Sequence, residues 1–153
     1  MSDHTYTPQP VSGLSPYLQV GGEGVRAAAD FYKKAFAAEE LAYMPMENDS
    51  RTMHCLVKVN GSTLMMCDSF PEHGHPARTP EAITLHIQVD DPQAWFDRAV
   101  AAGCKVEMPM DVQFWGDRYG QIVDPFGHSW AIATHVRDVG MEELKDAAKK
   151  MFS

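Results

Sequence analysis

Hydrophobic and polar positions alternate in two stretches of the chain that resemble each other, residues 14–20 and 83–89. In both stretches the first, fifth and seventh positions hold Leu, Ile or Val, and the positions between them hold residues such as Ser, Tyr, His and Gln. A period of two is typical of a β-strand, so we expect two strands with one packed face and one polar face. Their similarity indicates an internal repeat.

Each of these strands is followed by a turn and by apolar residues at helical spacing, within residues 28–36 and 95–100. Asp91 before a proline is a typical helix start, and Gly103 is a typical helix end. A Met-Pro-Met tripeptide follows both helices, and two further strands come after each tripeptide. We expect these strands at residues 53–59, 62–67, 119–123 and 129–134.

Each half therefore predicts a βαβββ module, and the fold class is α+β. A module of this size buries too little surface to be stable alone, so we expect the two modules to pack as one domain. With helices on the outer face, the curled mixed sheet leaves its polar face to line a cup-shaped cavity. The predicted parts are an N-terminal tail at 1–13, the modules at 14–70 and 83–135, a connector at 71–82 and an amphipathic C-terminal helix within 136–153.

Composition narrows the class of partner. The 153 residues carry a formal charge of −8, whereas nucleic-acid-binding domains are basic, so we expect no nucleic-acid partner. No uninterrupted run of hydrophobic residues exceeds four, which argues against a membrane span and predicts a cytoplasmic protein. Cys55, Cys67 and Cys104 have no CxxC spacing, which favours reduced thiols over disulfides or a zinc site.

Several local motifs support a family resemblance. They are Pro16-Tyr17-Leu18, the turn at residues 60–62, the segment Trp115-Gly116-Asp117-Arg118-Tyr119-Gly120, and Asp124-Pro125-Phe126-Gly127-His128-Ser129-Trp130. With the tandem modules, they resemble the vicinal oxygen chelate superfamily of glyoxalases, bleomycin-resistance proteins and extradiol dioxygenases, and in particular its PhnB-like branch. The resemblance covers residues 14–152.

The resemblance implies a cup that, in catalytic members, holds one divalent metal on four side chains from the first and last strands of both modules. In this sequence those positions fall near Ser15, Met65, Thr84 and Ala131. These residues are not the nitrogen and carboxylate donors that such a metal requires. We therefore expect no metal cofactor. A displaced divalent metal site built from His54, His86 and either Asp68 or Cys67 is the alternative.

The candidate site residues are mostly polar residues on the strand face that is expected to line the cup. His86 lies within an otherwise apolar strand and is the candidate acid, base or ligand-binding group, although a hydrogen bond with Tyr17 would explain it equally well. His73 and His75 lie in the polar connector, which favours solvated side chains. The candidate ligand-binding residues are Tyr17, Gln19, His54, Cys67, Gln88, Trp115 and Arg118.

Together these observations predict a homodimeric, glyoxalase/bleomycin-resistance-like protein that binds a small organic molecule in its cup. The first alternative is a metal-dependent lyase, isomerase or dioxygenase of the same superfamily. The second is a non-catalytic interaction protein whose cup is filled by its own side chains, such as Met65 and Met66. The sequence alone leaves open whether the protein is an enzyme.

Overall fold

The chain divides into two compact units, Met1–Pro80 and Glu81–Ser153, called unit 1 and unit 2 below. The computed structural model describes residues 13–21 and 24–153. Most of the predicted N-terminal tail, residues 1–12, lies outside the described residues. Each unit contains one of the two predicted modules, so the repeat seen in the sequence is a repeat of structure.

Unit 1 is a βαβββ module with a four-stranded mixed sheet. Its strand order is β1-β4-β3-β2, in which β1 runs parallel to β4 and the other neighbours are antiparallel. A short 3₁₀ turn, η1 (Pro71–His73), follows the last strand. The elements are β1 (Tyr17–Val20), α1 (Gly24–Phe36), β2 (Glu39–Pro45), β3 (Thr52–Val59) and β4 (Ser62–Asp68).

Unit 2 repeats this topology with the strand order β5-β8-β7-β6, and again the first and last strands of the module pair in parallel. A C-terminal helix, α3 (Met141–Phe152), follows the module at the predicted position, and none of its residues is buried against the described part of the chain. The other elements are β5 (Thr84–Gln88), α2 (Pro92–Ala102), β6 (Lys105–Val112), β7 (Asp117–Val123) and β8 (Ser129–His135).

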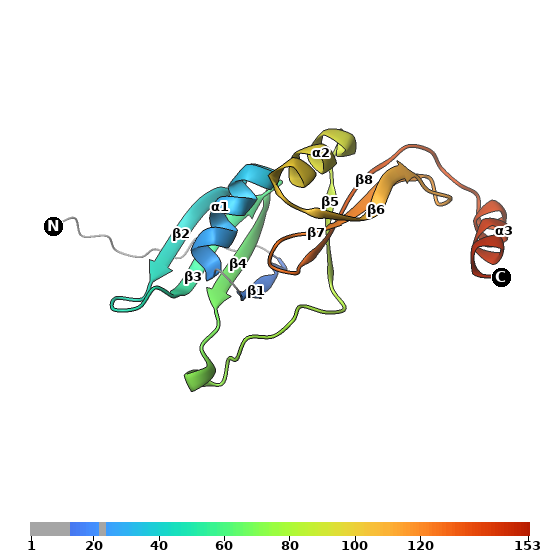
Figure 1. Cartoon of the computed structure of the whole chain (residues 1–153). Coiled ribbons are helices and arrows are strands. Elements are labelled where there is room, and N and C mark those ends of the chain that lie inside the picture. Colours follow the sequence, from blue (N-terminus) through green and yellow to red (C-terminus); the bar gives the residue numbers. More distant parts are fainter. Residues whose placement is uncertain (1–12, 22–23) are drawn as a thin grey trace. The chain divides into compact units, whose positions relative to one another are not determined.

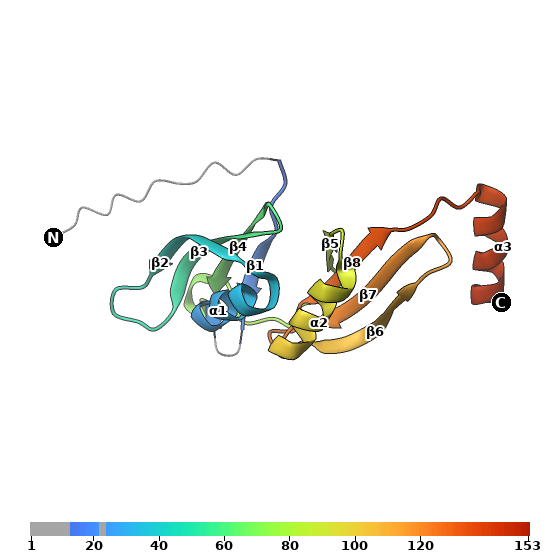
Figure 2. The same ribbon diagram turned by 90° about the horizontal axis from the view of Figure 1, so that it is seen from above.

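One helix covers one face of each sheet, α1 in unit 1 and α2 in unit 2 (Figures 1 and 2). The helix α1 buries Tyr32 and Phe36 completely, and Val20, Val57 and Met66 of the sheet are equally buried. In unit 2, Gly120 lets β7 approach α2, because an added Cβ would lie 2.8 Å from the Phe96 ring. Burial of these apolar faces is the main force that holds each layer pair together.

The predicted ends of α2 are confirmed. The Asp91 carboxylate accepts a hydrogen bond from the Ala94 amide at 3.1 Å, which satisfies one of the free N–H groups of the first turn. Gly103 ends the helix with a positive φ of 130°, and its amide donates to the carbonyl groups of Ala99 and Val100. Local sequence therefore sets both ends of this helix.

The two repeated strands are shorter than predicted. Leu14 and Ile83 precede β1 and β5 and are 96% and 71% exposed, so the prediction that they lie on the packed strand face is wrong. The alternation holds within the strands themselves, where Leu18, Val20 and Ile87 are buried. The closure of both modules around a shared cup stays a prediction.

The cysteines agree with the sequence expectation of reduced thiols. All three cysteines are free thiols, and burial raises the pKa of Cys55 to about 11 and of Cys104 to about 12.

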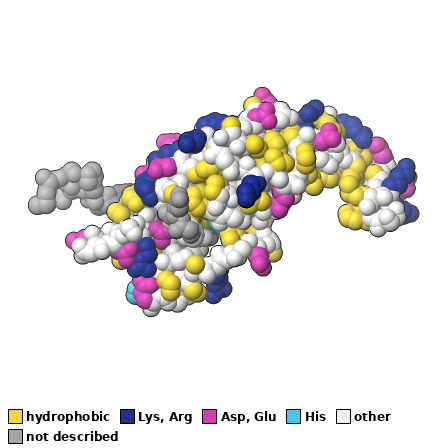
Figure 3. Space-filling view, in the orientation of Figure 1, with side chains coloured by type: hydrophobic (Ala, Val, Ile, Leu, Met, Phe, Trp, Pro, Cys, Tyr) yellow, Lys and Arg dark blue, Asp and Glu magenta, His cyan; other side chains and the backbone are white. Residues whose placement is uncertain are grey.

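Acidic and basic side chains are interspersed over the face shown in Figure 3. No helix in the described part of the chain is long and apolar enough to cross a membrane.

Candidate functional site

The polar face of the unit 1 sheet brings together four of the predicted site residues. Tyr17 on β1 lies opposite Met65 of β4, and Gln19 lies opposite Cys67, so these four side chains share the face turned away from α1. The Tyr17 hydroxyl lies 3.2 Å from His54 Nδ1 and also hydrogen-bonds to the Cys67 thiol. Tyr17 therefore links His54 and Cys67 in one polar cluster.

This cluster borders a cavity of about 600 Å³ that is lined entirely by unit 1. The volume lies within the range of small-molecule sites in proteins. Its walls are mainly apolar or aromatic, with Met46, Met53, Phe70 and the Tyr17 ring among them, and its polar side chains include Gln19 and Cys67. A few polar groups in an apolar cavity are the usual composition of a site for an organic ligand.

A β-bulge places Met53 in the cavity wall. The strand β3 pairs His54 with Met44 and Thr52 with Pro45, so Met53 is an extra residue without a partner on β2. A bulge of this kind redirects the side chains on one side of it. Thr52 is completely buried and donates to the Tyr43 hydroxyl at 3.1 Å, whereas Met53 is 49% exposed and lines the cavity.

The segment Ser69–Pro76, called the strap below, folds back to form another wall. Phe70 and His75 pair as an isolated β-bridge, which closes the strap into a tight loop. The Gln19 side-chain amide donates to Ser69 Oγ at 3.0 Å and to the Pro76 carbonyl at 2.5 Å. Gln19 thus fastens both ends of the strap to β1, and its donors are used for this purpose.

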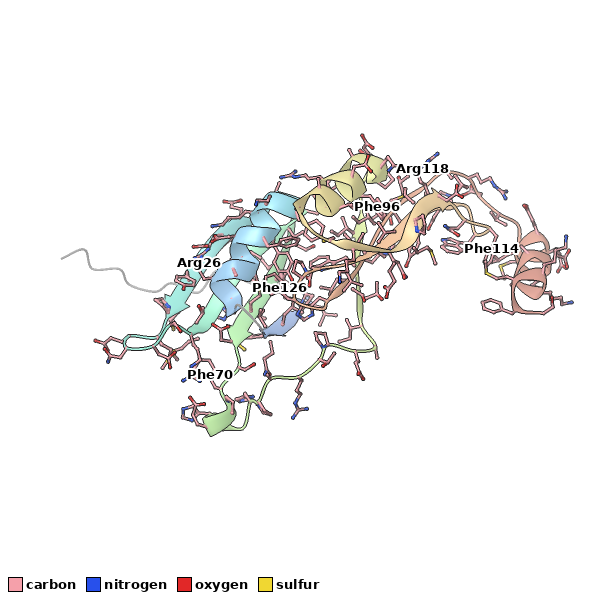
Figure 4. All side chains as sticks on the ribbon, in the orientation of Figure 1. Arg26, Phe70, Phe96, Phe114, Arg118 and Phe126 are labelled. Carbon is pink, nitrogen blue, oxygen red and sulfur yellow. The ribbon has the colours of Figure 1, made fainter. Side chains whose placement is uncertain are left out.

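Arg51 holds the strap from the opposite side. Its guanidinium lies 2.6 Å from the Asp49 carboxylate and 2.7 Å from that of Glu72 in the strap. These contacts lower the pKa values of Asp49 and Glu72 below their ordinary values, through hydrogen bonds with Arg51. The same guanidinium stacks over the Phe70 ring, which is labelled at the end of β4 in Figure 4.

Asp68, the last residue of β4, has a structural role. It is 6% exposed, and its two carboxylate oxygens accept hydrogen bonds from the backbone amides of Val25 at 2.9 Å and Thr52 at 2.6 Å. The carboxylate therefore joins the first turn of α1 to β3. Because both oxygens are used, Asp68 is a poor candidate for the metal ligand considered in the alternative site.

Cys67, the residue before Asp68, also lines the cavity. Burial raises the pKa of its thiol above the ordinary value, and the hydrogen bond with Tyr17 opposes that shift. The thiol form is therefore favoured at neutral pH, and Cys67 contributes a soft, weakly polar surface.

In unit 2, the corresponding face carries His86 and Gln88. His86 Nε2 lies 2.8 Å from the Gln88 side-chain carbonyl oxygen, so this ring nitrogen is the donor and only Nδ1 remains for a ligand or a metal. The His86 ring packs near Tyr119, with 6.0 Å between ring centroids. Gln121 donates to the Tyr119 hydroxyl at 2.7 Å. These side chains form a connected polar and aromatic surface.

Trp115 joins this surface, whereas Arg118 does not. The Trp115 ring meets the Tyr119 ring edge-on at 5.4 Å, and its indole N–H donates to Asp117. Because β7 begins at Asp117, Arg118 alternates with Tyr119 and shares the α2 side of the sheet with Gly120. Figure 4 shows Arg118 beside α2. The structure therefore does not bring Arg118 together with His86.

The residues at the four metal positions implied by the resemblance do not fit a divalent metal. Met65 pairs with Tyr17 and Ala131 pairs with His86, so a thioether and a methyl group stand on the last strands. The Ser15 hydroxyl is hydrogen-bonded to Thr63, and Thr84 supplies a second neutral hydroxyl. Within residues 13–21 and 24–153, no group of three or more His, Cys, Asp and Glu side chains is arranged to hold a metal ion.

The family model for the glyoxalase/bleomycin resistance protein/dioxygenase superfamily matches residues 16–132. The chain belongs to this superfamily. An uncharacterized protein of Mycobacterium bovis is 41% identical over 140 residues, which cover 88% of this chain and 90% of that protein. This chain also resembles solved structures of bacterial proteins, including the following two.

The first is a Pseudomonas aeruginosa protein, with a TM-score of 0.68 and 25% identity over 81% of this chain and 98% of that protein. The second is a PhnB protein from Bacillus cereus, with a TM-score of 0.62 and 20% identity over 81% of this chain and 98% of that protein. PhnB-like proteins are thus among the structural neighbours, as the local motifs predicted.

Sequence reasoning missed several residues of the cavity wall. His73 and His75 were expected to be solvated in the connector; their side chains are exposed, and they also line the cavity through the strap. Met53 lines the cavity because of a β-bulge, and no sequence motif predicts that bulge. Phe70, two residues after the end of β4, carried no sequence signal for its place in the cavity wall.

Proposed function

We propose that the protein binds a small organic molecule in the cavity of unit 1 and does so without a resident metal ion. The observation that carries this proposal is the cavity of about 600 Å³, whose apolar wall ends at the polar cluster of Tyr17, His54 and Cys67. An apolar wall supplies binding free energy, and one polar end orients the ligand.

The name of the superfamily covers both resistance proteins and enzymes such as dioxygenases. The choice between these roles therefore has to be argued from the side chains of the site. The four expected metal positions offer two hydroxyls, one thioether and one methyl group. This donor set favours binding over the metal-dependent lyase, isomerase or dioxygenase reaction. The homodimer and the cytoplasmic location stay predictions.

Ligand-observed NMR and isothermal titration calorimetry with 2-naphthol, a flat probe with one hydroxyl group, test the proposal. We expect saturable binding to the wild-type chain that is lost in Met53→Arg, which fills the cavity with a charged side chain. Met151→Arg is the matched control, because Met151 is 58% exposed on α3 and Met53 is 49% exposed on β3. Equal binding by both variants would contradict the proposal.

Elemental analysis of protein purified without chelator tests the proposal that no metal ion is resident in the protein. We expect less than about one-tenth of a divalent ion per chain, because sites that retain metals during purification have three or four good donors. One tightly held ion per chain would support the metalloenzyme alternative instead.

A further inference from the structure

The carboxylate of Asp68 and the guanidinium of Arg51, at or beside the cavity, are both engaged within the protein, and this limits the class of ligand. Asp68 is a charged side chain among the lining residues, and both of its oxygens accept backbone N–H groups. Arg51 lies next to the cavity wall, with carboxylates of Asp49 and Glu72 at its guanidinium. Neither charge is available to pair with a charged ligand.

The position of Arg51 gives a second reason why it does not pair with a charged ligand. Its guanidinium carbon lies 4.4 Å from the centroid of the Phe70 ring, so the arginine covers the ring that lines the cavity. The guanidinium therefore supports the aromatic wall without itself being a lining residue. A carboxylate or phosphate ligand in the cavity would lose its hydration without gaining this cation as a direct partner.

An ammonium ligand meets a similar difficulty. The Asp68 carboxylate is 6% exposed and its hydrogen bonds are part of the fold, so pairing with a cation would disturb the contact between α1 and β3. The other lining groups include the exposed His73 and His75 rings of the strap, the Met46 and Met53 thioethers, the Phe70 ring and the Cys67 thiol, whose raised pKa keeps it neutral. Such a surface stabilises an apolar, polarizable molecule.

From these contacts we infer that the ligand is an uncharged, flat and largely apolar molecule, bound against the Phe70 ring with its one polar group at the hydroxyl of Tyr17. This inference rests on the proposed function and names its ligand class. The polar end is assigned to Tyr17 because its hydroxyl already connects His54 and Cys67 at the cavity border. A phenol offers one donor and two acceptor positions, which suits a ligand hydroxyl.

Three probes of matched shape test the charge class: 2-naphthol, 2-naphthoate and 2-naphthylmethylammonium, titrated by calorimetry at neutral pH. We expect 2-naphthol to bind at least about tenfold more tightly than either ion, because an unpaired buried charge costs more than one hydrogen bond. If an ion binds equally or more tightly and loses its binding in Met53→Arg, the ligand class is overturned while the proposed function stands. If no probe binds, or if Met53→Arg binds like the wild type, both fall.

Tyr17→Phe tests the polar end, and the fold should tolerate it because Tyr17 is 52% exposed. We expect the affinity for 2-naphthol to fall about fivefold, as for loss of one hydrogen bond, and the affinity for 2-methylnaphthalene to stay unchanged. Equal losses for both compounds would overturn the role of the hydroxyl. Unchanged binding of both would place the polar group elsewhere.

Discussion

Arg51 covers the ring of Phe70, and this contact links the loop between β2 and β3 to the strap that closes the cavity. The arginine also bridges Asp49 in that loop and Glu72 in the strap. Arg51 therefore holds the Phe70 ring in place in two ways, through its ion pairs and through its stacking contact with the ring.

Arg51→Met should loosen the strap, because methionine keeps an apolar stem and removes the ion pairs. We expect faster amide hydrogen exchange at His73 and Gly74 and an affinity for 2-naphthol reduced by about threefold or more. Arg26→Met is the matched control. Arg26 also bridges two acids, Asp30 and Glu40, and lies 4.6 Å from the centroid of the Tyr43 ring, but it belongs to α1. Equal effects of both variants on binding would contradict a specific role of Arg51 in the site.

Asp68→Asn should destabilise the chain by about 1.5–3 kcal/mol, since one amide oxygen replaces two charged acceptors for the backbone amides of Val25 and Thr52. Urea denaturation followed by circular dichroism measures the loss. Asp30→Asn, in which the side chain is 62% exposed, should change the stability by less than about 1 kcal/mol. A loss in Asp68→Asn as small as this would mean that the two hydrogen bonds contribute little.

The sequence was sufficient for features that depend on neighbouring residues or on a strict period. The caps at Asp91 and Gly103 are local, and the polar parity of Tyr17 with Gln19 follows from the alternation of a strand. The repeat itself then predicted two modules with the same order of elements. These features are encoded within a few residues, so the structure confirms them.

The cavity wall could not be predicted in the same way, because it depends on contacts between distant segments. Gln19 reaches the Pro76 carbonyl, and Arg51 reaches Glu72. A single bulge at Met53 shifts the parity of Thr52, and a strand start at Asp117, two residues before the predicted start, puts Arg118 on the opposite face from Tyr119. Small changes of register thus decide which side chains meet in the site.

Gly116→Ala should be far more destabilising than Gly61→Ala, although both glycines have a positive φ. An added Cβ at Gly116 would lie 2.1 Å from the Arg137 carbonyl oxygen, whereas at Gly61 nothing lies within 4 Å. We expect a loss of about 1 kcal/mol for Gly61→Ala, from backbone strain alone, and about 3 kcal/mol or more for Gly116→Ala. Similar urea midpoints for the two variants would contradict this contact.

His128 should make the protein less stable as the pH falls. It is 8% exposed, its Nε2 has no hydrogen-bond partner within the described chain, and burial lowers its pKa below the ordinary value of 6.5, with Asp124 opposing this shift. The unfolded chain therefore takes up this proton at a higher pH than the folded chain, and stability decreases below about pH 6.5. Urea midpoints of His128→Leu should depend less steeply on pH between about 5 and 7 than those of the wild type. An unchanged slope would show that the folded protein tolerates protonation of this ring.

His135 should have the opposite effect. Hydrogen bonds to Asp117 and Asp138, at 3.0 and 2.7 Å, raise the pKa of its ring above 6.5. The folded chain therefore holds this proton more tightly than the unfolded chain, so the contribution is fully present below about pH 6.5 and is lost as the pH rises through the folded pKa. Between the folded pKa of His135 and about pH 6.5, the urea midpoints of His135→Asn, which lacks this contribution, should gain less or lose more on acidification than those of the wild type. High salt should weaken the difference, because His135 is exposed and its ion pairs are screened. A larger gain on acidification in His135→Asn over this pH range would reverse the sign and exclude a stabilising charge at this position.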